Sequence, residues 1–207
     1  SRLDDRYGAG GTFDTNNDAN SSSTSTPSPG NWSGILVSAG AQISLDYTTV
    51  AYAGGISRIE GSFRGFNALE IQQGTTRIAH STFEFNANGM GGQGPATRLG
   101  RLSNQPATIL MRGTSPIMID NVFNSNVSAE SNSISENRSA AISLEAHVMT
   151  ADLQGDRGRM TGNIDRRTDL DTNRGPLFRG NRFNNNDLNG LEIRGDNRTN
   201  NITPRPI

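Results

Sequence analysis

Three side chains of this sequence have the types that acid–base catalysis uses, and each follows a short apolar stretch. They are Asp46, His80 and Asp120. By aligning those stretches, we expect the three to occupy matching positions in successive units of a repeated fold, as a row of acid, imidazole and acid. Such a row could bind a metal ion or transfer protons. The alternative is that the three groups only cap strand starts as solvated polar side chains.

A second set of chemically capable side chains lies near the start of the chain and places oxygen atoms at alternate positions. The set is Asp14, Asn16, Asp18 and Asn20. Calcium takes about six to eight oxygen ligands, and this spacing is similar to the first half of an EF-hand loop. The sequence departs from that pattern at Ala19, where glycine is expected, and at Ser25, where a bidentate glutamate is expected. Calcium is thus the one cofactor that the sequence suggests. The alternative is that these residues form a solvated turn, and no cofactor is required for the predicted fold.

Several other chemistries lack their residues. The chain has no cysteine, which excludes disulfides and cysteine nucleophiles, and no lysine, which excludes lysine-dependent catalysis. No Gly-x-Ser-x-Gly elbow accompanies the two histidines, His80 and His147. No unit of the sequence stacks several aspartates beside an arginine, as a pectate-lyase-type site requires. An enzyme is therefore the less favoured class, although it stays open.

The composition predicts an elongated fold with a thin apolar interior. Of 207 residues, 32 % are hydrophobic and 24 are glycine, and the formal net charge is −1. Disordered chains usually carry high net charge, whereas here Ile, Val, Leu and Phe recur at spacing two, which is typical of strands. The near-neutral charge gives no electrostatic reason to expect nucleic acid or an anionic membrane as a partner. No run of about 18 apolar residues exists, so direct membrane insertion is not expected.

Similar segments recur along the chain and predict a solenoid. Each has a short strand, a glycine turn, two further short strands and an Asn-rich turn, over roughly 20–25 residues. A unit this small cannot bury its apolar stripe alone, and stacking supplies partners above and below. The predicted fold class is therefore all-β, a parallel β-helix of about four to five coils with two loop insertions.

Alternation within the strands predicts which side chains share the interior. The pairs expected to point inward are Ile35 and Val37, Leu69 and Ile71, and Leu191 and Ile193, with Ile35, Leu69 and Ile109 in one column. Leu36, Glu70 and Glu192 are expected to point outward. The sequence from Ser139 to Thr150 is interpreted as a strand, and Trp32 is expected to plug the end of the first coil.

Glycine and asparagine mark the expected corners, because both tolerate left-handed backbone conformations. The corner candidates are Gly40, Gly74, Gly113 and Asn126. Stacked asparagines can hydrogen-bond to one another and to turn backbone. Asn86, Asn126 and Asn186 are the candidates for one such ladder.

Three segments are expected. Residues 1–30 form a polar N-terminal loop or linker, residues 31–196 the parallel β-helix, and residues 197–207 a C-terminal tail. The insertions run from Gly89 to Asn104 and from about Thr150 to Gly175, and insertions in solenoids often map to the binding face. The chain starts without an initiator Met or a visible signal peptide, so we expect an excerpt or a processed product.

Three stretches carry a resemblance to a known group of proteins. They are Trp32-Ser-Gly-Ile, Leu45-Asp-Tyr-Thr-Thr-Val-Ala-Tyr-Ala-Gly-Gly, and Gly180-Asn-Arg-Phe-Asn-Asn-Asn-Asp-Leu-Asn-Gly-Leu-Glu-Ile-Arg-Gly. From about Asp14 to Gly195 the sequence resembles right-handed parallel β-helix segments of very large bacterial cell-surface or secreted proteins, in the pectate-lyase-like fold superfamily. The resemblance implies a right-handed solenoid in an extracellular or cell-surface location. The same fold serves pectate lyases, polygalacturonases and phage tailspikes, so it does not fix the function.

These observations favour a structural or adhesive module. Its expected partners are polysaccharide, other surface proteins or neighbouring copies of itself, with no nucleic acid. The first alternative is a polysaccharide-degrading lyase or glycoside hydrolase that uses Asp46, His80 and Asp120. The second is a carbohydrate-binding module without catalysis.

Overall fold

A computed structural model describes residues 27–59, 62–89, 104–114, 116–126, 139–146 and 176–195. Within these ranges the chain is all-β, without an α-helix, and most of its strands run parallel in stacked sheets. The described ranges contain no apolar helix of membrane-spanning length. The architecture is that of a parallel β-solenoid, as the segment repeats predict.

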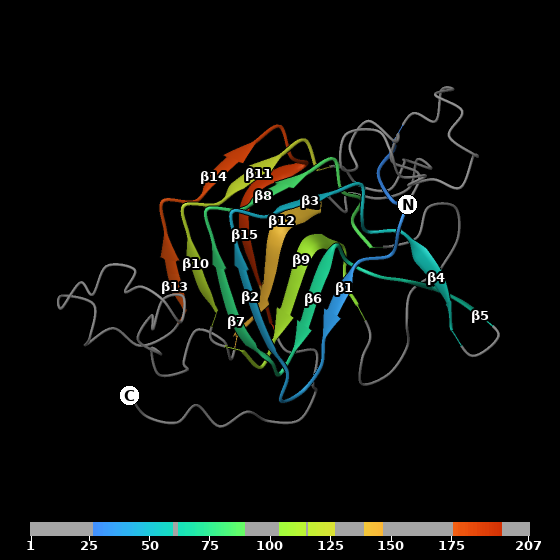
Figure 1. Cartoon of the computed structure of the whole chain (residues 1–207), viewed down its shortest axis with the longest axis horizontal. Helices are drawn as coiled ribbons and strands as arrows, with labels where there is room; N and C mark the ends of the chain where they lie inside the picture. The colour runs from blue at the N-terminus through green and yellow to red at the C-terminus, as the bar shows by residue number, and fades with distance from the viewer. Residues whose placement is uncertain are drawn as a thin grey trace, which may run out of the picture.

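Three parallel sheets enclose the interior (Figure 1). Sheet A has the strand order β1 (Ile35–Val37), β6 (Leu69–Gln72), β9 (Ala107–Arg112), β12 (Ala140–Glu145) and β15 (Leu188–Arg194). Sheet B contains β2 (Gln42–Asp46), β7 (Thr75–Ala79), β10 (Ile117–Ile119) and β13 (Leu177–Arg179). Sheet C contains β3 (Thr49–Ala51), β8 (Thr82–Glu84), β11 (Val122–Asn124) and β14 (Arg182–Asn184).

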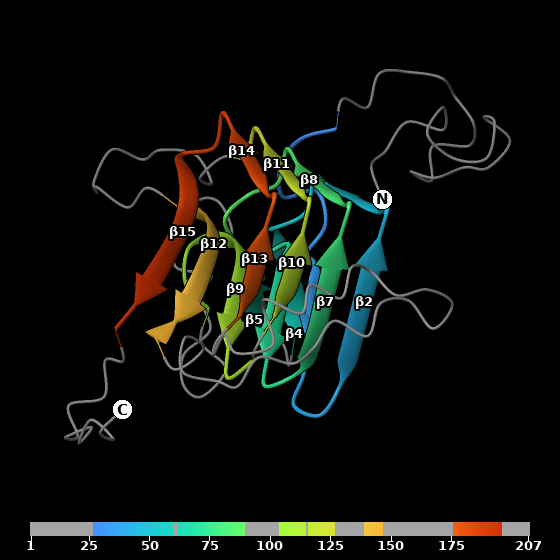
Figure 2. The same cartoon turned by 90° about the vertical axis from the view of Figure 1, so that its left-hand side faces the viewer.

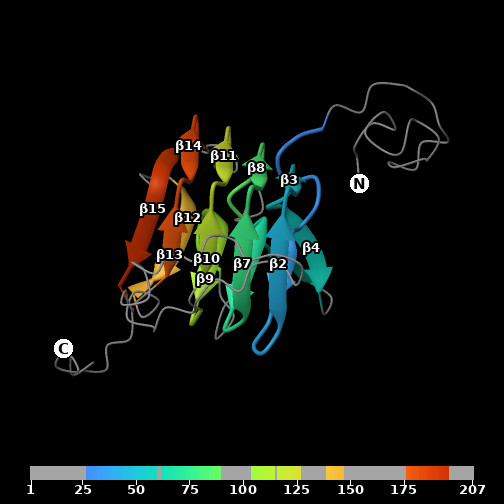
Figure 3. The ribbon, with the colours of Figure 1, turned by 60° about the vertical axis from the view of Figure 1, so that its left-hand side comes forward.

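The chain visits sheets A, B and C in turn and then starts again in sheet A beside its previous strand. Figures 2 and 3 show the result as a row in which β2, β7, β10 and β13 follow one another from the blue end of the chain to the red end. Residues about 30–60 positions apart in sequence therefore become neighbours, and equivalent side chains form columns along the stack.

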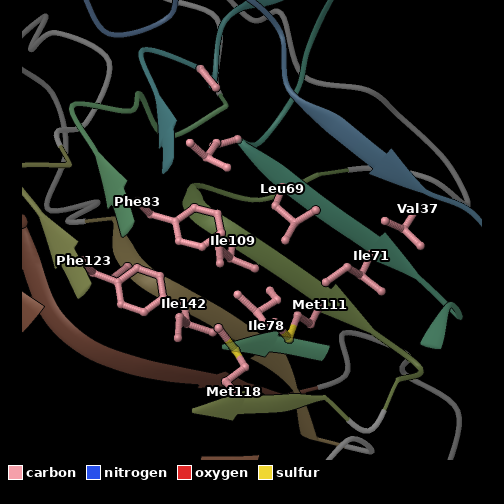
Figure 4. Close-up of a cluster of buried hydrophobic side chains, with 14 of the residues drawn as sticks. Val37, Leu69, Ile71, Ile78, Phe83, Ile109, Met111, Met118, Phe123 and Ile142 are labelled. Atoms are coloured by element: carbon pink, nitrogen blue, oxygen red, sulfur yellow. The ribbon is translucent and has the colours of Figure 1, made fainter. Parts of the chain in front are cut away.

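The interior is a column of apolar side chains from all three sheets (Figure 4). Pairing registers place Ile35 opposite Leu69 and Leu69 opposite Ile109, which confirms the predicted column. Phe83 and Phe123 stack in the interior with ring centroids 5.3 Å apart, and Phe123 stacks on Phe183 at 5.0 Å. Both Phe83 and Phe123 are fully buried, and each is the central residue of a three-residue strand whose two flanking side chains point outward.

The predicted asparagine ladder is confirmed at the corner that follows sheet C. Asn86 Nδ2 donates to Asn126 Oδ1 at 3.0 Å, and Asn126 Nδ2 donates to Asn186 Oδ1 at 2.7 Å. Each amide also donates to a carbonyl of the preceding repeat, as Asn126 does to Phe83 O at 3.0 Å. These bonds satisfy buried polar groups that would otherwise cost stability.

A second ladder, which the sequence analysis missed, lies at the corner between sheets B and C. The backbone N–H of Ser81 donates to Asn121 Oδ1 at 2.9 Å, and Asn121 Nδ2 donates to Asn181 Oδ1 at 2.9 Å. At the start of the stack, the N–H of Thr48 donates to Ser81 Oγ at 3.2 Å. Two ladders therefore hold the two ends of the sheet C strands.

Two corner predictions are corrected. Gly40 and Gly113 have positive φ as predicted, but in the repeat between them the left-handed residue is Gln73 (φ 61°) and not Gly74. A Cβ on Gly74 would instead crowd Val37 Cγ1 at 2.6 Å, so this glycine is needed for close packing. At the corner after sheet C, where Asn126 was predicted to turn, Ser125 (φ 50°) adopts the left-handed conformation, and Asn126 follows it as a ladder residue.

One insertion was not predicted. Strands β4 (Ile56–Ile59) and β5 (Ser62–Gly65) form an antiparallel hairpin that projects away from the three sheets (Figure 1). The interpretation of residues 139–150 as a strand is confirmed for β12, while His147 lies outside the described residues. Both predicted insertions fall mostly on residues outside that description, as do most of residues 1–30 and all of residues 197–207.

Candidate functional site

The residues predicted to form a catalytic row do not share one column. The register places Asp46 opposite Ala79, whereas His80 follows Ala79 and Asp120 follows Ile119, which is itself opposite Ala79. His80 and Asp120 are therefore equivalent positions, as predicted. The prediction was wrong for Asp46 by one residue, and the true equivalent of His80 in the first repeat is Tyr47.

Asp46 instead faces Arg77 on the outer face of sheet B. Its Oδ2 lies 3.5 Å from Arg77 Nη1, and both side chains are less than a tenth exposed. Asp46 is the last outward residue of β2, whereas His80 and Asp120 each follow the last residue of their strand and lie in the corner. Asp46 therefore points away from the sheet face and not into the corner column. A buried and paired carboxylate of this kind holds strands β2 and β7 together and is not presented to a substrate.

The corner column itself contains Tyr47, His80, Asp120 and Gly180. All four have left-handed backbones, with φ of 50°, 49°, 52° and 64°. The Tyr47 ring stacks on His80 with centroids 4.8 Å apart, and His80 Nδ1 lies 3.9 Å from Asp120 Oδ2. A Cβ at Gly180 would collide with Asp120 Oδ1, so the carboxylate lies over the glycine. The column is thus aromatic, imidazole and carboxylate in order.

This column could transfer protons but lacks the partner that glycoside cleavage needs. The His80 and Asp120 side chains are 29 % and 44 % exposed, so both reach solvent. Glycosidases use two carboxyl groups about 5–10 Å apart, and this column contributes only one. In the part of the chain that the structure describes, no group of three His, Cys, Asp or Glu side chains could hold a metal ion. The predicted calcium ligands Asp14, Asn16, Asp18 and Asn20 lie outside that part.

A polar network that the sequence analysis missed lies on the outer face of sheet A. Ser143 Oγ donates to Glu192 Oε2 at 2.7 Å and accepts from Arg194 Nε at 2.6 Å. Burial and the nearby Arg112 guanidinium lower the pKa of Arg194, while Glu192 and Glu145 oppose that change. Ser143 is fully buried, so its hydroxyl is not available as a nucleophile to a substrate in this arrangement. The aligned triplets Ile142-Ser-Leu and Leu191-Glu-Ile were the signal that could have found this pair.

The two glutamates predicted to face outward also differ in surroundings. Glu70 is fully buried and accepts a hydrogen bond from Gln72 Nε2 at 2.8 Å. Glu192 is partly exposed, and the strands β9 and β12 lie between β6 and β15. The two carboxylates therefore do not meet, as the spacing of their repeats predicts.

Comparisons with known proteins add no assignment to this geometry. No protein-family model matches the chain, and neither the curated proteins nor the solved structures contain a significant match.

Proposed function

We propose that this chain is a structural and adhesive module of a large extracellular or cell-surface protein, built as a right-handed parallel β-helix. About four to five coils would account for the five strands of sheet A and the four strands each of sheets B and C. The handedness follows the strong preference of parallel crossover connections. The pectate-lyase-like superfamily and the bacterial surface proteins resembled by the sequence are the proposed relatives.

The two hydrogen-bonded ladders are the observation that carries this proposal. They connect successive repeats at both ends of sheet C through buried amides, for example Asn86 to Asn126 and Asn121 to Asn181. On sheet B the outward charged side chains of Asp46 and Arg77 are also paired with each other. The polar side chains of the described residues thus mainly stabilise the stack, which suits a rigid spacer that presents a lateral face.

Hydrogen exchange of the whole chain tests the rigid-spacer proposal. We expect the amides of β6 to β14 to exchange slowly and with similar opening free energies, because each repeat is stable only through its neighbours. The N–H groups of Asn86 and Asn126, which donate to the next ladder residue, should belong to this slow set. Fast and independent exchange of individual repeats would contradict the proposal.

Self-association is a further part of the proposed role. Ile193 lies in register with the interior residue Leu144, yet its side chain is 53 % exposed because β15 is an edge strand of sheet A. Exposed strand edges with apolar side chains are templates for pairing with another chain. This supports stacking of neighbouring copies through sheet A.

The alternative is a polysaccharide-degrading enzyme that uses the imidazole of His80 and the carboxylate of Asp120, 3.9 Å apart, in place of a pair of carboxyl groups. Incubation with acidic and neutral polysaccharides, with and without calcium, tests it. New reducing ends or unsaturated products that disappear in the Asp120→Ala variant, but persist in Asp187→Asn, would establish the enzyme. Without turnover in any of these mixtures, the structural role stands.

A further inference from the structure

The outer face of sheet C differs from the outer faces of the other two sheets in its exposure. On sheet A the outward side chains Glu70, Leu110 and Ser143 are fully buried, and on sheet B Ala79 and Ile119 are at most 2 % exposed. Among the described residues of sheet C, by contrast, no outward strand side chain is buried. Sheets A and B do expose outward side chains in their first strands, such as Leu36, Gln42 and Ser44. In the part of the chain that the structure describes, sheet C is therefore the lateral face whose outward side chains stay accessible in every repeat.

The outward side chains of sheet C form two parallel columns. The first is Thr49, Thr82, Val122 and Arg182, and the second is Ala51, Glu84, Asn124 and Asn184. Hydroxyl and amide groups, which both donate and accept hydrogen bonds, make up half of the eight. One acid and one base balance each other, and only the alanine and the valine are apolar.

Aromatic side chains border this face on both sides. On the sheet B side Tyr47 stacks on His80, and on the far side Tyr52 stacks on Phe85 with centroids 5.6 Å apart. Tyr47 is 74 % exposed and Phe85 is 37 % exposed. In the first two repeats the face is thus a strip of hydrogen-bonding groups between two aromatic margins, which continue in the later repeats as the polar or small corner residues Asp120, Gly180, Ser125 and Asn185.

The chemistry of this strip excludes several partner classes. A polyanion such as nucleic acid, or an anionic membrane, needs clustered basic residues, whereas the strip has a single arginine, Arg182, and a single glutamate, Glu84, on different strands. Stable protein interfaces have an apolar centre, and the centre of this strip is polar. An uncharged partner rich in hydroxyl groups matches the hydroxyls, amides and aromatic margins.

We propose that the outer face of sheet C is a binding surface for neutral polysaccharide, with the glycan chain extended along the solenoid axis. Parallel registers repeat the same positions at the strand spacing of about 4.8 Å, so an extended polymer meets an outward hydroxyl or amide in each repeat: Thr49, Thr82, Asn124 and Asn184. Individually weak contacts then add along the chain of the ligand. This inference rests on the proposed adhesive function and specifies its surface and its ligand class.

Affinity electrophoresis of the whole chain in gels that contain a soluble polysaccharide tests the proposal. The neutral probes are β-glucan, galactomannan and xylan, and the acidic probes are polygalacturonate and hyaluronan. We expect at least one neutral probe to retard the chain. Replacing Asn124 and Asn184 together by alanine should weaken that retardation about tenfold or more, because each loses hydrogen bonds to the ligand.

A matched control is available on sheet B, where Gln42 and Ser44 are exposed outward residues of β2. Replacing both by alanine should leave the retardation unchanged. The proposal is overturned if no neutral probe retards the chain, if only acidic probes do, or if the sheet C and sheet B double variants behave alike. If binding fails while the slow hydrogen-exchange block is intact, the rigid module stands and only the glycan surface is rejected.

Discussion

At the corners of the solenoid, a residue with a strained, left-handed backbone is followed directly by an asparagine whose side-chain amide is buried. Asp120 with φ 52° precedes Asn121, and Ser125 with φ 50° precedes Asn126. A left-handed conformation costs a non-glycine residue about 1–2 kcal/mol, and the following amide offsets this by bonding to the next repeat. The corner residue itself points to solvent, so its chemistry can vary from tyrosine to glycine without loss of the turn.

Replacing Asn126 by alanine tests the energetic weight of the ladder. The change removes the donor to Phe83 O and to Asn186 Oδ1, and leaves the N–H and the amide of Asn86 without their acceptor. We expect about 2–4 kcal/mol lower free energy of unfolding, because buried groups are left unsatisfied. Denaturant unfolding measures it, and the outward variant Asn124→Ala, expected to change stability by less than about 0.5 kcal/mol, is the control. Equal effects of the two variants would contradict a structural ladder.

At the scale of strands, much of the fold could be predicted because the period of two fixes the face of each side chain. Ile35, Leu69 and Ile109 fall in one column for that reason. The predicted row of Asp46, His80 and Asp120 is wrong only at Asp46, which lies one position before the equivalent of His80. Counting back from the interior residues Val50 and Phe83 gives Tyr47 as the partner of His80.

The sequence also contains a regular spacing that indicates the second asparagine ladder. The spacing of five between Asn121 and Asn126 recurs between Asn181 and Asn186, and each pair supplies both ladders. The burial of Glu70 could not be predicted, since alternation indicates only that a side chain leaves the interior. Whether an outward side chain is exposed to solvent depends on contacts with segments distant in sequence, which the alternation within one strand does not indicate.

The phenylalanine column predicts a gradient of stability from strand to strand. Phe123 is fully buried between two rings, whereas Phe183 on the edge strand β14 is only partly buried. We expect Phe123→Ala to cost about 3–5 kcal/mol, because it opens a cavity. Phe183→Ala should lower the free energy of unfolding by only about 1–2 kcal/mol, because the partly exposed Phe183 side chain buries less apolar surface on folding. Thermal or denaturant unfolding measures both, and a reversed order would show that the interior is not organised around the middle of the stack.

At the scale of the whole molecule, side chains from within the chain cover parts of both ends of the stack, while other strand edges stay exposed. The Trp32 indole N–H donates to Ala51 O at 2.8 Å on the first strand of sheet C, and its partly buried side chain packs against the apolar interior. At the other end, β15 has one residue more than β12 between their paired positions. This bulge brings Asn189 Oδ1 to Asn186, where it accepts from the backbone N–H and from Nδ2 at 2.9 Å each. The chain thereby supplies its own last rung of the ladder, while the edge of sheet A stays exposed.

Association of copies should therefore depend on sheet A and can be tested through Ile193. In the described residues this side chain is the most exposed member of the interior column, at 53 %. We expect the molecular mass in solution, measured by sedimentation at several concentrations, to rise with concentration. Ile193→Asp should shift the chain to monomer, because a charge at an apolar edge disfavours pairing.

Ile56 on the hairpin is 42 % exposed, so Ile56→Asp is a matched control that should leave association unchanged. A strictly monomeric parent chain, or equal effects of both variants, would remove end-to-end association from the proposed role without affecting the rigidity of the stack.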